Sequence, residues 1–142
     1  MATADNIPAG FGPLPRTSPA IELIGPIHAK GLGSDMVLGL RAEPKQCNGR
    51  HKVHGGILAD VALGYATSFS THPPTGMVTA NLSLDYTGSA QVGDWLETSV
   101  DVHKIGSRLA FASAHIHRNG ERIVRASAVF VVATAPDAEP NT

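Results

Sequence analysis

Residues 54–70 read HGGILADVALGYATSFS, and this stretch decides the fold of the chain. Its apolar side chains recur at intervals of three and four residues, which is the period of an α-helix with one buried face. These side chains are Leu58, Val61, Ala62, Tyr65 and Phe69. His72-Pro73-Pro74 follows as a stop signal, because a proline disfavours helical backbone in the residue before it. The sequence therefore predicts one long helix over residues 55–70.

The opposite side of this predicted helix is small and polar, and it carries Gly56, Asp60, Gly64 and Thr67. Two glycines on either side of an acid would let a ligand or another backbone approach the helix closely. Asp60 is therefore a candidate for chemistry, with an ordinary solvated residue as the alternative.

A polar loop leads into the helix and ends in Gly55-Gly56. The N–H groups at a helix start have no partner within the helix, and the helix dipole adds partial positive charge there. Such a start can hold the oxygen of a carbonyl under attack, as an oxyanion hole does. A simple glycine-rich loop is the alternative.

Six further stretches have the length and the β-branched content of strands. They are residues 27–30, 36–43, 77–86, 94–104, 108–118 and 122–132. Short turns join the last four, with Asn119-Gly120 as the strongest hairpin signal, so we expect an antiparallel four-stranded meander after the helix. The predicted fold class is α+β, with one long helix against an antiparallel sheet of about five or six strands. One helix covers only one sheet face, so we also expect a homo-oligomer.

Length and composition set the domain organisation. The 142 residues predict a flexible arm over residues 1–20, one domain over residues 21–133 and a tail over residues 134–142. A formal net charge of -1 argues against a nucleic-acid binder. No signal peptide or membrane span is predicted, and Cys47 is the single cysteine, so the expected location is the cytoplasm.

The histidines and the cysteine do not form a metal-binding pattern. Cys47, His51 and His54 have only loosely ligand-like spacing, and His115 and His117 would share a strand face. Neither a His-Glu-x-x-His helix nor a Cys-x-x-Cys pair occurs, so we expect no metal. No Gly-x-Ser-x-Gly elbow occurs either, so a Ser-His-Asp triad is not predicted.

Several motifs follow one another along the chain in a definite order. They are Asn48 and, six residues later, His54-Gly55-Gly56; Asp60 followed by Val61-Ala62-Leu63-Gly64; and residues 78–86, 92–94 and 104–111. Together they resemble the hotdog-fold thioesterases that act on acyl-coenzyme A, and most closely the phenylacetate-degradation type, a 4-hydroxybenzoyl-CoA thioesterase-like branch. The resemblance covers residues 21–132 and implies a hotdog fold, a long central helix wrapped by the sheet.

The resemblance also implies an active site at the interface of a dimer, often a dimer of dimers, with no cofactor. The Gly55 N–H would polarise the thioester carbonyl. Asp60 would be the nucleophile or the general base that activates water, reaching across from the partner subunit. Asn48 and His54 would hold the thioester or the water, and Thr79 lies where some relatives position the water.

The expected substrate is an aryl or medium-chain acyl-CoA. Gly56 and Tyr65 are candidates to line the acyl slot. Four residues are candidates to bind coenzyme A, because they lie at strand ends and turns where basic or hydroxyl groups could meet phosphates: Lys104, Ser107, Arg108 and Arg118. An ordinary charged hairpin rim is the alternative.

The chain departs from the family pattern in one interval. Relatives place the acid about two turns beyond the first glycine, whereas Asp60 follows Gly55 by only five residues. Three missing residues would shift the acid by about 4.5 Å along the helix and about 60° around it. Either the helix start compensates, or the chain is a hotdog module that binds acyl-CoA without hydrolysing it. A hotdog dehydratase or hydratase is a further alternative, although its Asp-x-Asn-Pro-x-His motif is absent.

Overall fold

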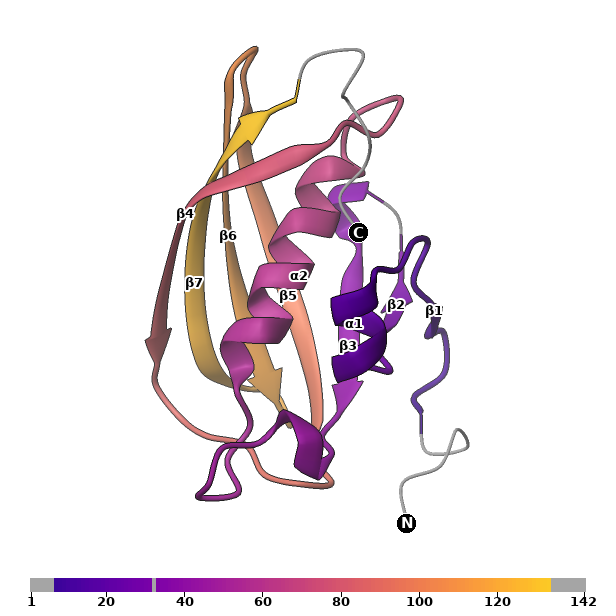
Figure 1. Ribbon diagram of the computed structural model, residues 1–142, viewed down its shortest axis with the longest axis vertical. Coiled ribbons are helices and arrows are strands. Elements are labelled where there is room, and N and C mark those ends of the chain that lie inside the picture. Colours follow the sequence, from indigo (N-terminus) through magenta and orange to yellow (C-terminus); the bar gives the residue numbers. More distant parts are fainter. Residues whose placement is uncertain (1–6, 32, 134–142) are drawn as a thin grey trace.

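The computed structural model describes residues 7–31 and 33–133, apart from the side chain of Ser34. In this part of the chain a long helix, α2 (Gly55–Ser68), lies across one antiparallel sheet (Figure 1). The strands are β1 (Gly12–Pro13), β2 (His28–Lys30), β3 (Val37–Arg41), β4 (Met77–Tyr86), β5 (Trp95–Ile105), β6 (Leu109–Arg118) and β7 (Glu121–Val132). Three short helices precede α2: α1 (Pro19–Ile24), η2 (Gly33–Asp35) and η3 (Pro44–Gln46). The predicted α+β class and central helix are confirmed.

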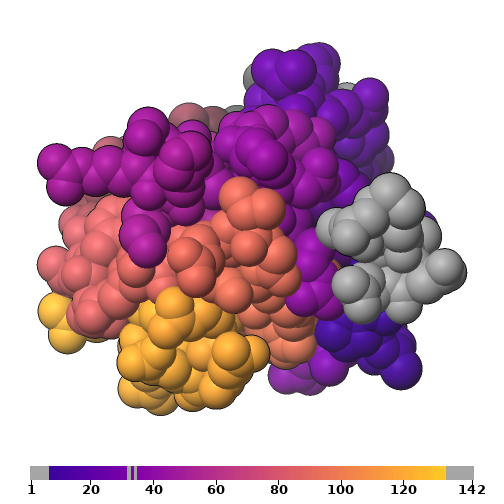
Figure 2. Space-filling view, turned by 90° about the horizontal axis from the view of Figure 1, so that it is seen from below, coloured from indigo at the N-terminus to yellow at the C-terminus, as the bar shows by residue number. Residues whose placement is uncertain are grey.

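The sheet order corrects the predicted meander. The order is β1-β2-β3-β5-β6-β7-β4, so β4 pairs with β7 and not with β5, its successor along the chain. The connection between β4 and β5 passes beneath the start of α2 in Figure 1, and Figure 2 shows it beside the loop that leads into α2. There the Val53 N–H donates to the Ala90 carbonyl at 2.9 Å, and Lys52 bridges to Gln91. This crossing leaves β4 as an edge strand beside α2.

Residues 12–20, which lie in the predicted arm, include β1 and the start of α1. β1 pairs with β2, and the Phe11 ring packs edge-on against Trp95 with 5.1 Å between centroids. Ser18 caps α1 by accepting a hydrogen bond from the Ile21 N–H at 3.3 Å, which is a usual N-cap arrangement. The predicted boundary at residue 20 therefore falls inside α1. Residues 1–6 and the predicted tail over 134–142 lie outside the described residues.

The core forms between α2 and the concave side of the sheet. Leu58, Ala62 and Leu63 are at most 1% exposed, and they meet strand residues such as Ile116 and Phe130, which are 0% exposed. Thr67, predicted on the polar side of the helix, is also 0% exposed, because it lies one turn beyond Leu63 on the sheet side.

No helix among the described residues is both long enough and apolar enough to cross a membrane.

We predict that Leu63→Ala lowers the free energy of unfolding by about 2–5 kcal/mol, because it leaves a cavity under α2. Leu23 is 76% exposed, so Leu23→Ala is the matched control and should change stability by less than about 0.5 kcal/mol. Urea unfolding of both variants measures the difference. Equal effects would contradict the packing described for α2.

Candidate active site

A cavity of about 700 Å³ lies between α1, α2 and β4. Polar residues line it from three elements: Ser18 at the start of α1, His54, Gly56 and Asp60 at and after the start of α2, and Thr79 and Tyr86 on β4. Apolar side chains from all three elements line the rest of the wall: Ile21, Ile24, Ile57, Val61, Leu82 and Leu84. The cavity therefore brings a helix start, a carboxylate and hydroxyl groups together in a largely apolar recess.

Asp60 faces this cavity despite the short interval that precedes it. Gly56, Asp60 and Gly64 follow one another at intervals of four residues, lie on one side of α2, and all line the cavity. Leu63, which stands at the family's customary distance from Gly55, is 0% exposed in the core. The position of the acid along the chain therefore matches the side of α2 that is open to a ligand.

Partial burial raises the pKa of the Asp60 carboxyl above its ordinary value. The physical cause is the loss of hydration, which destabilises the charged form of the carboxyl. A raised pKa brings a carboxylate closer to neutral pH, where a general base is most effective.

The two glycines at the helix start differ in what their N–H groups do. The Gly55 N–H donates to the Val53 carbonyl at 3.0 Å, and Gly55 is buried and does not line the cavity. The Gly56 N–H donates to the Tyr86 hydroxyl at 3.0 Å, at the wall of the cavity. The oxyanion role of Gly55 stays a prediction, and of the two N–H groups the one at the cavity wall is that of Gly56.

The structure separates the two residues predicted to hold the thioester or the water. His54 lines the cavity and precedes α2 as its N-cap residue. Asn48 lies in the preceding loop, where its side-chain oxygen accepts hydrogen bonds from the N–H groups of Arg50 and Lys52 at 2.8 and 3.2 Å. Asn48 thus shapes the loop and does not line the cavity of the single chain.

Thr79 and Tyr65 both line the cavity. Thr79 is exposed on β4, next to a register shift between Thr79 and Asn81. The Tyr65 hydroxyl donates to the Arg16 carbonyl, and burial raises the pKa of Tyr65 to about 12 against an opposing effect of Arg16. Tyr65 therefore presents its ring to the cavity, while its hydroxyl fastens the segment before α1.

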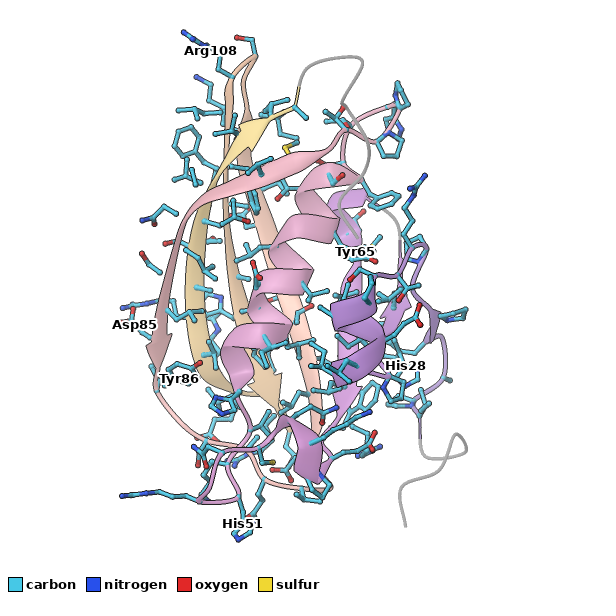
Figure 3. The ribbon with its side chains drawn as sticks, in the orientation of Figure 1. His28, His51, Tyr65, Asp85, Tyr86 and Arg108 are labelled. Carbon is cyan, nitrogen blue, oxygen red and sulfur yellow. The ribbon has the colours of Figure 1, made fainter. Side chains whose placement is uncertain are left out.

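The predicted coenzyme A residues fall at two ends of the molecule. Lys104, Ser107 and Arg108 lie in and beside the β5–β6 turn, and Figure 3 shows Arg108 at the end opposite to His51 and the start of α2. Arg118 lies at the other end of β6, where it pairs with Glu121 at 2.8 Å and donates to the Ser89 carbonyl. One chain does not bring these four residues to a single anion site.

The described residues show neither a metal-binding cluster nor a Ser-His-Asp row inside the cavity. Within residues 7–31 and 33–133, no group of three or more His, Cys, Asp or Glu residues is placed to hold a metal ion. On the outer face of the sheet, the Ser113 hydroxyl lies 2.9 Å from His103 Nε2, and His103 Nδ1 lies 3.5 Å from Asp101. His103 and Asp101 are 51% and 76% exposed, and this row does not line the cavity, so it offers no enclosed place for a substrate.

Sequence reasoning missed Tyr86 and the contribution of α1. Leu82, Leu84 and Tyr86 alternate along β4, so they share a face, and that alternation was a signal available in the sequence. Which element that face meets follows only from the pairing of β4 with β7. The α1 residues had no comparable signal, because their segment is short and broken by Gly25-Pro26.

Comparisons with known proteins agree with this architecture. The family model described as the thioesterase superfamily matches residues 52–125. A protein of Pseudomonas aeruginosa named "Putative esterase PA0474" is 50% identical over 130 residues, which span 88% of this chain and 96% of that protein.

Two solved structures are also similar. The E. coli PaaI protein from the phenylacetic acid degradation operon has a TM-score of 0.73 and 18% identity, over 82% of this chain and 86% of that chain. The protein smu.793 from Streptococcus mutans UA159, bound to acetyl-CoA, has a TM-score of 0.69 and 18% identity, over 77% and 90%. These likenesses confirm the predicted hotdog fold.

We predict that Asp60→Asn stabilises the protein at neutral pH more than at about pH 4. Because the folded-state pKa of Asp60 is raised, the folded state binds the proton more tightly than the unfolded state does. Stability from this group is therefore lost as the pH rises above about 4, the pKa of an unperturbed aspartate. Unfolding midpoints of parent and variant at the two pH values measure the effect. A difference that is independent of pH would contradict it.

Proposed function

The chain belongs to the thioesterase superfamily, and from this we propose that it hydrolyses acyl-coenzyme A thioesters to a free acid and coenzyme A. The observation that carries the proposal is the cavity in which a helix start, Asp60 and the Thr79 hydroxyl lie within an apolar wall. A thioester is already an activated acyl group. A carboxylate that handles water and a fixed donor for the carbonyl oxygen are sufficient chemistry to hydrolyse it.

Asp60 is the proposed nucleophile or general base, and Thr79 the proposed partner of the attacking water. His54 lines the same cavity and can hold the thioester. We place the carbonyl oxygen beside Gly56, one residue beyond the sequence prediction, because the Gly56 N–H meets the Tyr86 hydroxyl at the cavity wall while the Gly55 N–H donates to Val53.

The placement of Asp60 supports hydrolysis over binding alone. The interval between Gly55 and Asp60 is about three residues shorter than in relatives, which raised the alternative that Asp60 is displaced and that the chain only binds acyl-CoA. Asp60 lies one helical turn beyond Gly56 on the same side of α2, so the shorter interval still leaves the carboxylate on the cavity wall.

The apolar wall suits an aryl or medium-chain acyl group. It is built from residues such as Ile24, Ile57 and Leu84, and a cavity of this size, about 700 Å³, lies within the range of small-molecule sites. The relative from Streptococcus mutans was solved with acetyl-CoA, which supports coenzyme A as the carrier. A substrate of this kind also fits the predicted cytoplasmic location.

We further propose a homodimer formed through β4. This strand is an edge of the sheet, and an unpaired edge is a template for pairing with another strand. Val78 on β4 is 63% exposed, and its neighbour Val131 on β7 is 44% exposed, so the edge carries apolar surface that a second copy can cover. The cavity lies against the same strand, which would place it at the dimer interface.

We predict that Asp60→Asn lowers kcat about 100-fold or more, while substrate binding changes only a few-fold, because the carboxylate is needed in the transition state. Asn48→Ala and Thr79→Ala should cost less. The measurement is thiol release from a panel of aryl and straight-chain acyl-CoAs, with binding measured separately by calorimetry.

The matched control is Asp85→Asn, since Asp85 pairs with Arg125 at 2.8 Å and does not line the cavity. Equal turnover by Asp60→Asn and the parent would remove Asp60 from the mechanism. Acyl-CoA binding without any turnover by the parent would favour the binding module. Turnover of an enoyl-CoA without thiol release would favour a hydratase.

We predict that the parent sediments as a dimer or a dimer of dimers, and that Val78→Lys shifts it toward the monomer, because a charge on an edge strand opposes strand pairing. Val92 is 47% exposed in the β4–β5 connection, so Val92→Lys is the control that should keep the assembly intact. Sedimentation velocity measures both. A monomeric parent would overturn the proposed interface.

A further inference from the structure

The side chain of Tyr86 contacts the start of α2. Tyr86 is the last residue of β4, and its hydroxyl accepts a hydrogen bond from the Gly56 N–H at 3.0 Å. Both residues line the same cavity as Asp60. Figure 3 shows Tyr86 beside the first turn of α2, on the β4 side. A side chain from a strand thus meets the backbone group where a carbonyl oxygen would be expected to bind.

The glycine pair makes room for this contact. A Cβ on Gly56 would lie 2.8 Å from the Tyr86 hydroxyl and 2.7 Å from Leu84 Cδ1. A Cβ on Gly55 would lie 2.9 Å from Val124 Cγ2 and 3.6 Å from Tyr86 Cε1. Real Cβ atoms essentially never show contacts below 3.0 Å, so a side chain at residue 56 would displace the end of the Tyr86 or the Leu84 side chain. Glycine at residue 56 therefore favours the contact between Tyr86 and the helix start.

The hydroxyl proton of Tyr86 is available to a ligand. A phenolic hydroxyl both donates and accepts, and this one accepts from Gly56. Within the described residues, the Tyr86 O–H donates to no other group. Tyr86 is 55% exposed and lines the cavity, so a carbonyl oxygen in the cavity can accept this proton in a hydrogen bond. The hydrogen bond from the helix-start amide polarises the O–H and strengthens it as a donor.

We propose that Tyr86 is a catalytic residue whose hydroxyl, backed by the Gly56 N–H, donates to the thioester carbonyl oxygen. This proposal rests on the proposed function. When water attacks, a C–O bond forms, the carbonyl π pair moves to oxygen, and Asp60 takes the proton that the water gives up. Tyr86 keeps its proton and stabilises the new oxyanion through the hydrogen bond. The C–S bond then breaks, and the coenzyme A thiolate leaves and receives the proton held by Asp60.

An opposite role is possible for the same contact, and it predicts the opposite result. If the Tyr86 hydroxyl only blocked the Gly56 N–H, the substrate carbonyl would have to displace that hydroxyl in order to bind. Loss of the hydroxyl would then raise kcat/KM. If the hydroxyl only packed against the helix, its loss would leave turnover unchanged. The direction of the change therefore decides between the three roles.

Tyr86→Phe is the test, because it keeps the ring and removes only the hydroxyl. We expect kcat to fall about 100- to 1,000-fold, as for the loss of one oxyanion donor, with KM changed less than about threefold. Ser83→Ala removes a hydroxyl from β4 at a residue that does not line the cavity, so it should keep full activity. Thermal unfolding of each variant verifies that the fold is intact. Unchanged or increased kcat/KM in Tyr86→Phe would overturn the proposal.

A spectroscopic measurement separates this proposal from the proposed function. The probe is a ketone analogue of acyl-CoA in which a methylene replaces the sulfur and the carbonyl carbon is ¹³C. We expect its bound carbonyl stretch to lie at lower frequency in the parent and in Asp60→Asn than in Tyr86→Phe. Identical frequencies in the parent and Tyr86→Phe would refute the donor role even where hydrolysis depends on Asp60. If the carbonyl frequency differs between the parent and Tyr86→Phe but the parent shows no turnover, the donor contact would be supported and the proposed hydrolysis would be refuted.

Discussion

The packing of α2 against the sheet is the constraint on which the rest of the site depends. Leu58, Ala62 and Leu63 are at most 1% exposed, so they fix the rotation of the helix about its axis. Any other rotation would expose at least one leucine, at a cost of about 1.5–3 kcal/mol, and would bury the Asp60 carboxylate. With the core side fixed, Gly56 and Asp60 are left on the side that faces the cavity. The core therefore determines where the acid stands.

The same packing sets the electrostatics of the acid. The cavity wall around Asp60 is largely apolar, with Ile57 and Val61 as its neighbours on α2. This partial burial raises the pKa of Asp60, because the charged form of the carboxyl loses part of its hydration. A carboxyl with a raised pKa on the wall of a cavity is a candidate for acid–base chemistry. The cost to stability and the strength of the base have one physical cause.

Periodicity explains which features the sequence could predict. The helix and six of the strands were found because buried faces repeat every 3.6 or two residues, and that repeat is local. The order of the strands was not found, because the period of β4 is the same whether it pairs with β5 or with β7. Asp60 was predicted from the polar side of the helix and Thr79 from the family resemblance, and both line the cavity. Tyr86 was missed, since its importance depends on the contact of β4 with α2, which joins residues 30 positions apart.

The contact between Tyr86 and Gly56 also offers a physical reason why a shortened helix interval can be tolerated. If donor and acid both belonged to the helix, three missing residues would change their separation by about 4.5 Å, and the reacting atoms would lose alignment. In this chain the proposed donor hydroxyl comes from β4, whereas Asp60 comes from α2. Their separation then depends on how the strand lies against the helix, and the number of residues between Gly55 and Asp60 has less influence on it. At the helix start, the missing side chain of Gly56 leaves the space into which the hydroxyl of the strand's tyrosine fits.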